Sequence, residues 1–342
     1  MNQKNQPLVS IIIPVYNVES YLYKNLSNIQ DQHYTKFEII YVNDGSTDNS
    51  AQILKELEKL DARVRVVTQK NSGTGSARNN GVQNSKGEFI YFMDPDDNID
   101  SQLLTDNIEK IIKRNADILV FDFNSIDVNG NMVEERCFKH LTDVYSVQIL
   151  LSNFTELYEI GVFDTLWHKI FKKDFIQQYK VVAPTWSNAQ DRGFLLRLIS
   201  HGPRISFNKS GKFYYHYMVS RGGASTAKFR PNLTKVFVES AQETTNALTL
   251  LKGKTTSRLS YLMYIRDIYL NVFFNTWRQK SPEKISSKMS VINGIYDSQE
   301  FRRYLNKVKL YDVSLSVREN IIVNIARWRF TLLLMILKRL KN

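Results

Sequence analysis

The sequence has a single cysteine, Cys137, among its 342 residues. One cysteine excludes an internal disulfide framework and a zinc site built from several cysteines, and it fits a reducing compartment. Residues 1–7 are polar and lack the basic start and apolar stretch of a secretory signal. The longest apolar stretch near the C-terminus, residues 332–337, is far shorter than the roughly 20 residues that cross a bilayer. We therefore expect a cytoplasmic protein without a membrane-spanning segment.

The composition is that of a folding chain. Hydrophobic residues make up 43%, charged residues 23% and aromatic residues 12%, which excludes a wholly disordered or low-complexity protein. At roughly 150 residues per domain, the length suggests about two domains. The net charge of +12 is unevenly distributed, because residues 1–100 carry −3 and residues 301–342 carry +8. A basic end can meet nucleic acid, anionic lipid or neither, so the function has to be sought in the N-terminal half.

The first 125 residues alternate between apolar runs and helical periodicity. We expect strands over residues 8–13, 37–42, 64–68, 88–93 and 117–123, and helices over residues 18–29, 48–60, 76–83 and 103–114. Strands separated by helices favour a mainly parallel α/β sheet flanked by helices, whose ligand site lies at the carboxyl ends of the strands.

Beyond residue 125 the alternation loosens. Residues 128–131 are typical of a hairpin turn, and the chain from residue 233 onward is helix-like, with few Gly or Pro. We expect three parts, which are a nucleotide-binding half (1–125), an acceptor-binding half (126–230) and a helical C-terminal region (231–342). The last part ends in a basic amphipathic helix.

Two features follow the first two predicted strands. Residues 14–17 (Pro-Val-Tyr-Asn) offer the aromatic face of Tyr16 and polar groups at the mouth of the sheet. Asp44 ends the second strand, where its carboxylate can accept an N–H of a nucleobase while Gly45 permits a close turn. Taken singly, each also fits an ordinary structural turn.

Two further features follow the next strands. The small-residue loop 71–79 opens a helix and can bring backbone donors and Arg78 near a phosphate, but it matches neither a dinucleotide fingerprint nor a P-loop. Asp94, Asp96 and Asp97 follow an apolar strand, and their mutual repulsion is offset when a hard divalent cation binds them. Such a cation would bridge a diphosphate, although a solvated acidic turn has the same sequence.

These four motifs, in this order, resemble the nucleotide-sugar half of a family 2 glycosyltransferase with the GT-A (Rossmann-like) fold. The matching segments are residues 9–17, 39–48, 76–79 and 92–97. The resemblance implies an inverting, hexosyltransferase-type enzyme that moves a sugar from a nucleotide diphosphate sugar, most often a uridine diphosphate sugar, to a hydroxyl of a glycan acceptor. It also implies Mn²⁺ or Mg²⁺ as cofactor and no covalent intermediate.

The resemblance assigns roles to residues at the donor site. Tyr16, with Pro14 and Asn17 beside it, would stack near the nucleobase, and Asp44 would bind the base edge. Arg78 would lie beside the base and ribose. Asp94 would be nearer the ribose and Asp96 on the metal, as the two acids of the D-x-D signature, and both are expected as metal ligands. Asp97 is a further acid of the same run.

The later segments supply the remaining expected residues. Asp191 is the expected general base, although Gln190 stands where the family usually has a second acid. Trp167 would form a floor for the acceptor sugar, His216 would complete the metal site, and Arg221 would bind phosphate. Purely structural roles are also possible for these residues. Asp191 could cap a helix, Trp167 could belong to the core, and His216 could be a hydrogen-bonded or solvent-facing histidine.

The C-terminal helix, residues 321–342, mixes apolar and aromatic side chains with Arg and Lys. Such a helix can lie on the anionic inner face of the cell membrane, and the acceptor would then be a lipid-linked glycan for a cell-surface polysaccharide. Alternatively it packs on the protein or on a second copy in a homodimer. A non-catalytic GT-A-fold protein that binds a nucleotide sugar or a membrane partner is the alternative function. We expect no nucleic-acid partner, because the first hundred residues are acidic and carry no recognisable nucleic-acid module.

Overall fold

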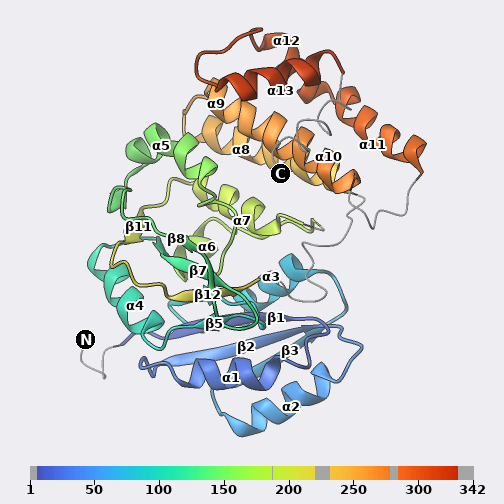
Figure 1. The fold of residues 1–342 in the computed structure, drawn as a ribbon. Helices are drawn as coiled ribbons and strands as arrows, with labels where there is room; N and C mark the ends of the chain where they lie inside the picture. The colour runs from blue at the N-terminus through green and yellow to red at the C-terminus, as the bar shows by residue number, and fades with distance from the viewer. Residues whose placement is uncertain (1–5, 187, 220–231, 278–283, 330–342) are drawn as a thin grey trace. The chain divides into compact units, whose positions relative to one another are not determined.

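The computed structural model describes residues 6–186, 188–219, 232–277 and 284–329 (Figure 1). The chain folds as two compact units. The first, here called the sheet unit, takes residues 1–152 and 163–224, and the second, the helical unit, takes residues 153–162 and 225–342.

An eight-stranded sheet forms the centre of the sheet unit. Its strands, in spatial order, are β3 (Val64–Gln69), β2 (Phe37–Asp44), β1 (Val9–Val15), β4 (Phe89–Phe92), β10 (Lys169–Lys172), β6 (Ile118–Phe121), β11 (Ile205–Asn208) and β9 (Val144–Tyr145). The first four run parallel, whereas β10 is antiparallel to both β4 and β6. The predicted α/β class with a large sheet flanked by helices is confirmed, with β10 inserted against the parallel direction.

Apolar side chains on both faces of β1 explain why helices cover the sheet on two sides. The helices of this unit are α1 (Leu22–Gln30), α2 (Ser50–Leu60), α3 (Thr74–Asn84), α4 (Leu103–Lys113), α6 (Lys173–Gln178), α7 (Gln190–Ile199) and the start of α5 (Val147–Glu159), whose residues from 153 onward belong to the helical unit. Ile11 and Ile13 join one hydrophobic cluster with the buried residues of α1, α2 and α4. Ile12 points to the other face, where a Cβ on Gly81 of α3 would lie 2.3 Å from its Cγ2. A strand buried on both faces therefore sits between two helical layers.

The segment predicted as one strand, residues 117–123, forms two strands in different sheets. β6 ends at Phe121, and β7 (Phe123–Ile126) joins a second, four-stranded sheet in the order β5 (Asn98–Ile99), β12 (Tyr215–Met218), β7 and β8 (Met132–Arg136). Between them, the buried carboxylate of Asp122 accepts hydrogen bonds from the Phe138 N–H (2.8 Å) and the Cys137 thiol (3.2 Å). These bonds tie the chain down where it passes between sheets. The predicted hairpin over residues 128–131 is present between β7 and β8.

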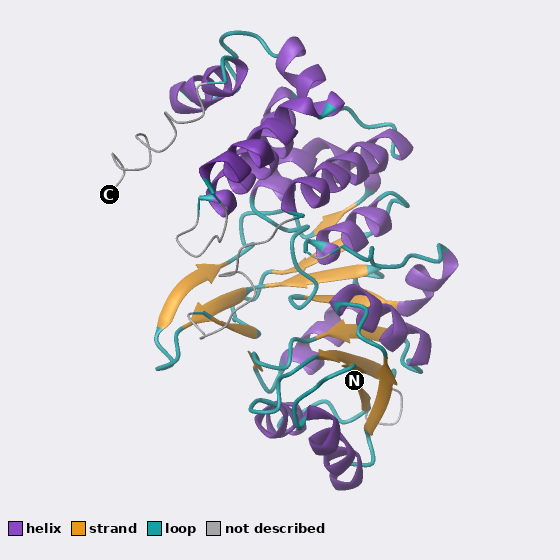
Figure 2. Cartoon of the chain, turned by 90° about the vertical axis from the view of Figure 1, so that its right-hand side faces the viewer, coloured by secondary structure: helices purple, strands orange, loops and turns teal. Residues whose placement is uncertain are grey.

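The described residues of the helical unit form helices and loops (Figure 2). They are α8 (Leu233–Leu250), α9 (Ser257–Ser260), the π-helix η3 (Tyr261–Leu270), α10 (Asn271–Thr276), α11 (Ile285–Asp297), α12 (Gln299–Lys307) and α13 (Val317–Arg327). The predicted helical C-terminal region is confirmed. The start of the predicted terminal helix lies in α13, and residues 330–342 lie outside the described residues. Among the residues described, no helix has the length and apolar character needed to cross a membrane.

Candidate functional site

The carboxyl ends of β2, β1 and β4 lie side by side, because these three strands pair in parallel. Pro14 is buried in β1 opposite Val42 of β2. Asn17 accepts a hydrogen bond from the Thr47 N–H at 2.7 Å and so joins the two loops that follow β1 and β2. Tyr16 lies beside it with 48% of its surface exposed. Its ring is therefore accessible to a ligand at this edge of the sheet.

Asp44 anchors the loop that opens α3. Its Oδ1 accepts from the Ser72 N–H (2.8 Å) and from Gln69 Nε2 (2.8 Å), while its Oδ2 accepts from the Gly73 N–H (2.8 Å). Gly73 has φ = 87°, a conformation that favours glycine. The carboxylate thus shapes this loop, a structural role that the sequence reasoning missed. The predicted bond to a nucleobase stays a prediction.

Arg78 connects the acidic run after β4 to the predicted general base. Its Nη2 donates to Asp94 Oδ1 at 2.9 Å, and its Nη1 donates to Asp191 Oδ1. The side chain is buried, and its Nε has no hydrogen-bond partner in the structure. Three residues that are far apart in the sequence are therefore joined in one ion-pair network. The predicted place of Arg78 beside the base and ribose is untested.

The network depends on close packing of α3 against the loop before α7. The Asn79 side chain forms two hydrogen bonds with the backbone of Ala183. Asn79 Nδ2 donates to the Ala183 carbonyl at 3.0 Å, and the Ala183 N–H donates to Asn79 Oδ1 at 2.7 Å. A Cβ on Gly75 would lie only 2.7 Å from the Pro184 carbonyl oxygen. Glycine at this position therefore allows the approach that brings Arg78 to Asp191.

Asp191 lies in the first turn of α7, with 16% of its side chain exposed. Its Oδ2 also accepts from the Leu166 N–H at 3.3 Å. Burial raises the pKa of Asp191 above its usual range, while the positive charge of Arg78 opposes that rise. A carboxylate with a raised pKa is a stronger proton acceptor than an exposed one. This environment suits the general base predicted from the sequence.

The acidic run divides into one buried and two more accessible carboxylates. Asp97 accepts from the Tyr215 hydroxyl (2.6 Å) and the Met218 N–H (2.9 Å), and burial together with the charge of Asp94 raises its pKa to about 8. The Asp94 side chain is 29% exposed. Asp96 is partly exposed and lines a cavity of about 320 Å³. Asp94 and Asp96 are therefore the carboxylates that can reach a ligand.

These two oxygen donors fit a hard divalent cation. Within the described part of the chain, no group of three or more His, Cys, Asp or Glu side chains is arranged to hold a metal. Mg²⁺ and similar ions commonly take one or two carboxylates and complete their coordination with substrate phosphates. The His216 ring is hydrogen-bonded to Asn124 Oδ1 (2.7 Å), so its predicted metal role stays a prediction. Arg221 lies outside the described residues.

Trp167 belongs to an aromatic stack. It is 6% exposed, with its ring 4.4 Å from Tyr215 and 5.8 Å from Tyr217 and nearly parallel to both. It thereby supports Tyr215, which holds Asp97. Its predicted contact with an acceptor sugar is untested and would involve only the small part of the side chain that is exposed.

A buried polar pair behind Asp191 escaped the sequence reasoning. Lys169 Nζ donates to the Thr165 carbonyl (2.7 Å) and forms a hydrogen bond with His168 Nε2 (2.8 Å). Burial lowers the pKa of both side chains well below their usual ranges, and their proximity adds to the shift of His168. The sequence did offer one signal for this pair, which is a lysine at the start of the buried strand Lys169–Lys172. Lysine is almost never fully buried without a partner, so a buried polar partner could have been expected nearby.

The fold is that of the GT-A class, and the acidic run lies at the carboxyl ends of its parallel strands. Residues 10–173 match the sequence model described as Glycosyl transferase family 2. The match covers β1 to β4 and residues 167–169, and it ends before Asp191. The family resemblance predicted from the motifs is therefore confirmed.

Two known proteins show how far the similarity extends. Glycosyltransferase GlyA of Streptococcus pneumoniae is 35% identical over 176 residues, which is 50% of this chain and 25% of that protein. TarS of Staphylococcus aureus, a poly(ribitol-phosphate) β-N-acetylglucosaminyltransferase, is 28% identical over 210 residues, which is 60% of this chain and 35% of that protein. The curated relatives named here therefore extend well beyond the region of similarity.

Two solved structures share the fold. The structure of TarS residues 1–349 with UDP-GlcNAc has a TM-score of 0.67 at 20% identity, covering 94% of this chain and 88% of that one. A mannosyltransferase from Pyrobaculum calidifontis, in complex with GDP-Man and Mn²⁺, has a TM-score of 0.50 at 13% identity, covering 96% and 88%. At these identities the likeness concerns the fold alone.

Proposed function

We propose that this protein is an inverting, metal-dependent glycosyltransferase that moves a sugar from a uridine diphosphate sugar to a hydroxyl of a glycan acceptor. One observation carries the proposal, which is the network in which Arg78 joins Asp94 of the D-x-D run to Asp191. The match of residues 10–173 to the family 2 model and the UDP-GlcNAc complex of TarS support this class of donor.

The chain's own residues divide the work of one displacement. Tyr16 stacks on the nucleobase, and Asp44 with the loop that it anchors binds the base edge. Asp191 accepts the proton of the acceptor hydroxyl as that oxygen bonds to the anomeric carbon and the bond to the diphosphate breaks. Arg78 holds Asp191 in position and keeps its pKa from rising further. No covalent nucleophile is required, because a single displacement inverts the anomeric centre.

Asp94 and Asp96 are the residues that would hold Mn²⁺ or Mg²⁺. A cation held there offsets the negative charge that develops on the departing diphosphate. The oxygen donor set of these two accessible carboxylates supports this assignment, as does the Mn²⁺ complex of the Pyrobaculum protein.

We further propose that the acceptor is a glycan of a cell-surface polysaccharide, in lipid-linked form, at the inner face of the cell membrane. The similarity to TarS, a poly(ribitol-phosphate) β-N-acetylglucosaminyltransferase, supports a cell-surface acceptor. Exposed apolar side chains near the C-terminus, including Val313, Val317 and Trp328, together with the basic charge of residues 301–342, support peripheral contact with anionic lipid.

Calorimetric titration with UDP tests the donor site. We expect wild-type protein to bind UDP in the presence of Mn²⁺, to lose binding when a chelator is added, and to lose it in Asp96→Asn. Asp100→Asn is the matched control, because Asp100 lies near the same run but pairs with Lys212 at 2.8 Å. Equal loss in both variants would refute a specific role for Asp96.

Turnover separates the enzyme from a non-catalytic relative. Asp191→Asn should retain UDP binding but lose transfer from UDP-GlcNAc by at least about a hundredfold, as expected for loss of a general base. Retention of full transfer would remove Asp191 from the mechanism. If the wild-type protein binds a nucleotide sugar without turning it over, the non-catalytic alternative takes precedence.

A further inference from the structure

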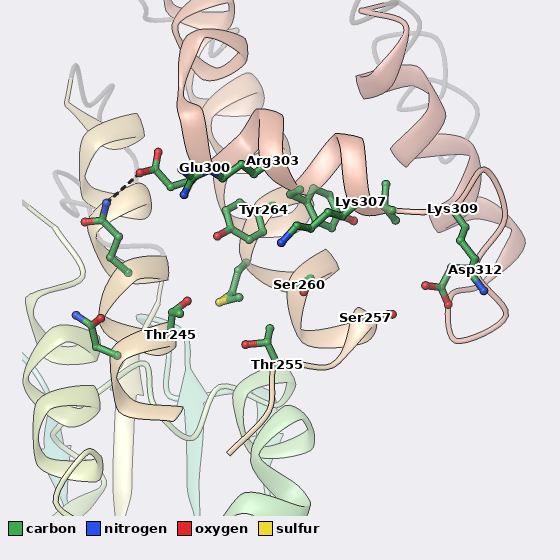
Figure 3. Close-up of a pocket in the computed structure, with 15 residues that line it drawn as sticks. Thr245, Thr255, Ser257, Ser260, Tyr264, Glu300, Arg303, Lys307, Lys309 and Asp312 are labelled. Carbon is green, nitrogen blue, oxygen red and sulfur yellow. Dashed lines mark hydrogen bonds between the residues drawn. The ribbon is translucent and has the colours of Figure 1, made fainter. Parts of the chain in front are cut away.

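The helical unit contains a cavity of about 530 Å³ that the proposed transfer does not use (Figure 3). One face of α12 contributes Glu300, Arg303, Tyr304 and Lys307, which follow helical spacing. Thr245 of α8 and the hydroxyl side chains of residues 255, 257 and 260 lie on the opposite side of the pocket from α12. Cavities of this size are typical of sites for small molecules.

The charges of this pocket are not balanced by its own ion pairs. Arg303, Lys307 and Lys309 line it and form no ion pair with any residue in the described ranges. The lining also contains two acids, Glu300, which accepts from Gln242 (3.4 Å), and Asp312, which accepts from the Ser314 hydroxyl (2.6 Å) and whose pKa is lowered by that bond and in part by Lys309. The lining therefore carries three cations against two carboxylates, and Arg303 and Lys307 are the cations most available to an anionic group.

Tyr304 supplies a second, independent observation. It is only 8% exposed, it lines the pocket, and its hydroxyl has no hydrogen-bond partner in the structure. Its ring lies against Tyr264, with centroids 5.1 Å apart and planes 15° from parallel. Buried hydroxyls normally have a partner, so an oxygen of a ligand would satisfy this one.

The backbone beneath these tyrosines is also unusual. Tyr264 lies on η3, a π-helix of ten residues, and Met263 beside it also lines the pocket. π-helical segments are rare and occur frequently at functional sites, because the wider turn displaces side chains from their α-helical positions. Here that turn presents an aromatic face to the cavity.

We propose that this pocket binds a sugar phosphate or polyol phosphate. The phosphate would lie among Arg303, Lys307 and Lys309, and the sugar or polyol hydroxyls would bond to the Thr and Ser side chains opposite and to Tyr304. A phosphate alone would leave the hydroxyl-rich wall unused, and a neutral sugar would leave the cations without a partner. The proposal concerns the helical unit alone and does not depend on the transferase activity.

Titration calorimetry of the full chain with glucose 6-phosphate tests the proposal, with glucose and inorganic phosphate as separate probes. Saturating UDP and Mn²⁺ are present throughout, so that binding at the donor site does not contribute. We expect glucose 6-phosphate to bind at least about tenfold more tightly than either probe. Equal binding of inorganic phosphate reduces the site to a simple anion site, and equal binding of glucose or no binding at millimolar concentration also overturns the proposal.

Variants assign the binding to this pocket. Arg303→Gln and Lys307→Gln, made singly and together, should weaken binding, by about tenfold or more in the double variant, whereas Arg302→Gln, which removes one cation from a neighbouring position of α12 outside the pocket, should not. Tyr304→Phe removes the unpartnered hydroxyl, so it should weaken binding while leaving thermal stability equal or higher. Unchanged affinity in the double variant or in Tyr304→Phe would overturn the assignment.

Discussion

At the residue scale, one buried cation controls two carboxylates. Arg78 donates to both Asp94 and Asp191, which would otherwise repel each other in a poorly solvated place. Breaking a buried ion pair by removing one partner leaves an uncompensated charge, and the buried Asp191 would respond by binding a proton more readily. Arg78 is therefore best understood as a positioning residue, whatever contact it makes with a donor.

Replacing Arg78 by Gln should shift the pH dependence of transfer. Burial already raises the pKa of Asp191, and Arg78 lowers it, so removal of the cation raises the pKa further. We expect the acidic limb of the pH–rate profile to move to higher pH by roughly one unit or more, together with a reduced rate. Arg65→Gln removes a partly exposed ion pair with Glu38 and should leave the profile in place. An unshifted limb in Arg78→Gln would contradict the assignment of Asp191 as the base.

The buried His168 makes stability depend on pH. Burial and the neighbouring Lys169 hold the pKa of His168 well below 6.5, so the folded protein keeps it neutral while the unfolded chain takes up a proton below that pH. Stability should therefore fall as the pH drops from 6.5, by up to about 2 kcal/mol at pH 5 from this residue.

Denaturant unfolding of His168→Asn between pH 5 and 8 measures this contribution. The variant is expected to be less stable than wild type at pH 8, because hydrogen bonds to Thr165 and Lys169 are altered, and to lose less stability on acidification. His33→Asn, at an exposed position, should leave the wild-type pH dependence almost unchanged. Parallel pH curves for wild type and His168→Asn would refute the prediction.

At the scale of elements, α3 is the connection on which the site depends. It packs on β1 through Gly81, carries Arg78, and meets the loop before α7 through Gly75 and Asn79. The same helix thus links the D-x-D strand end to Asp191. A small displacement of α3 would separate these groups without changing any of them chemically.

Gly75→Ala tests this dependence. The added Cβ would lie 2.7 Å from the Pro184 carbonyl oxygen, a backbone atom, so α3 or the loop has to move. We expect a loss of about 1–3 kcal/mol in the free energy of unfolding and a larger proportional loss of transfer than of UDP binding. Gly294→Ala, in α11 with no atom within 4 Å of the new Cβ, should instead stabilise by about 0.5–1 kcal/mol. Unchanged stability and transfer in Gly75→Ala would show that this contact is not needed.

At the scale of the whole molecule, the helical unit presents apolar side chains to solvent near its basic end. Leu310, Tyr311, Val313, Val317, Ile321 and Trp328 are all exposed. The buried face of α13, including Ile322, Val323 and Ile325, packs within the protein. Deleting this helix would therefore remove core residues, so exposed substitutions are the better test of membrane contact.

Val317→Glu combined with Trp328→Ser should reduce sedimentation with vesicles that contain phosphatidylglycerol. Both side chains are exposed, so the fold should be retained. The variant loses the apolar side chain of Val317 and the aromatic ring of Trp328, which would insert into the membrane interface. Val128→Glu, an exposed position on the hairpin of the sheet unit, is the matched control. Equal sedimentation of all three proteins, or equal binding to uncharged vesicles, would contradict contact with anionic lipid. A concentration-dependent change in mass on light scattering would favour the homodimer instead.

The sequence alone was sufficient for the parallel strands, their helices and the polar groups that follow each strand. Alternating hydrophobic periods are local properties, and parallel pairing brings strand ends to one edge whatever the details of packing. The family motifs carry equally local information, so the order of the chain was enough to predict donor-site roles for Asp44, Arg78, Asp94 and Asp96, and these roles stay predictions.

Only the tertiary structure decided how those groups interact. The bond from Arg78 to Asp191, the capture of Asp97 by Tyr215, and the burial of Trp167 and Lys169 join segments separated by many residues. The passage of the chain at Asp122 from one sheet to another also depends on a distant partner, the Phe138 N–H. Burial and partner distance arise from packing, and periodicity along a chain contains no measure of either, so these features could be learned only from the folded molecule.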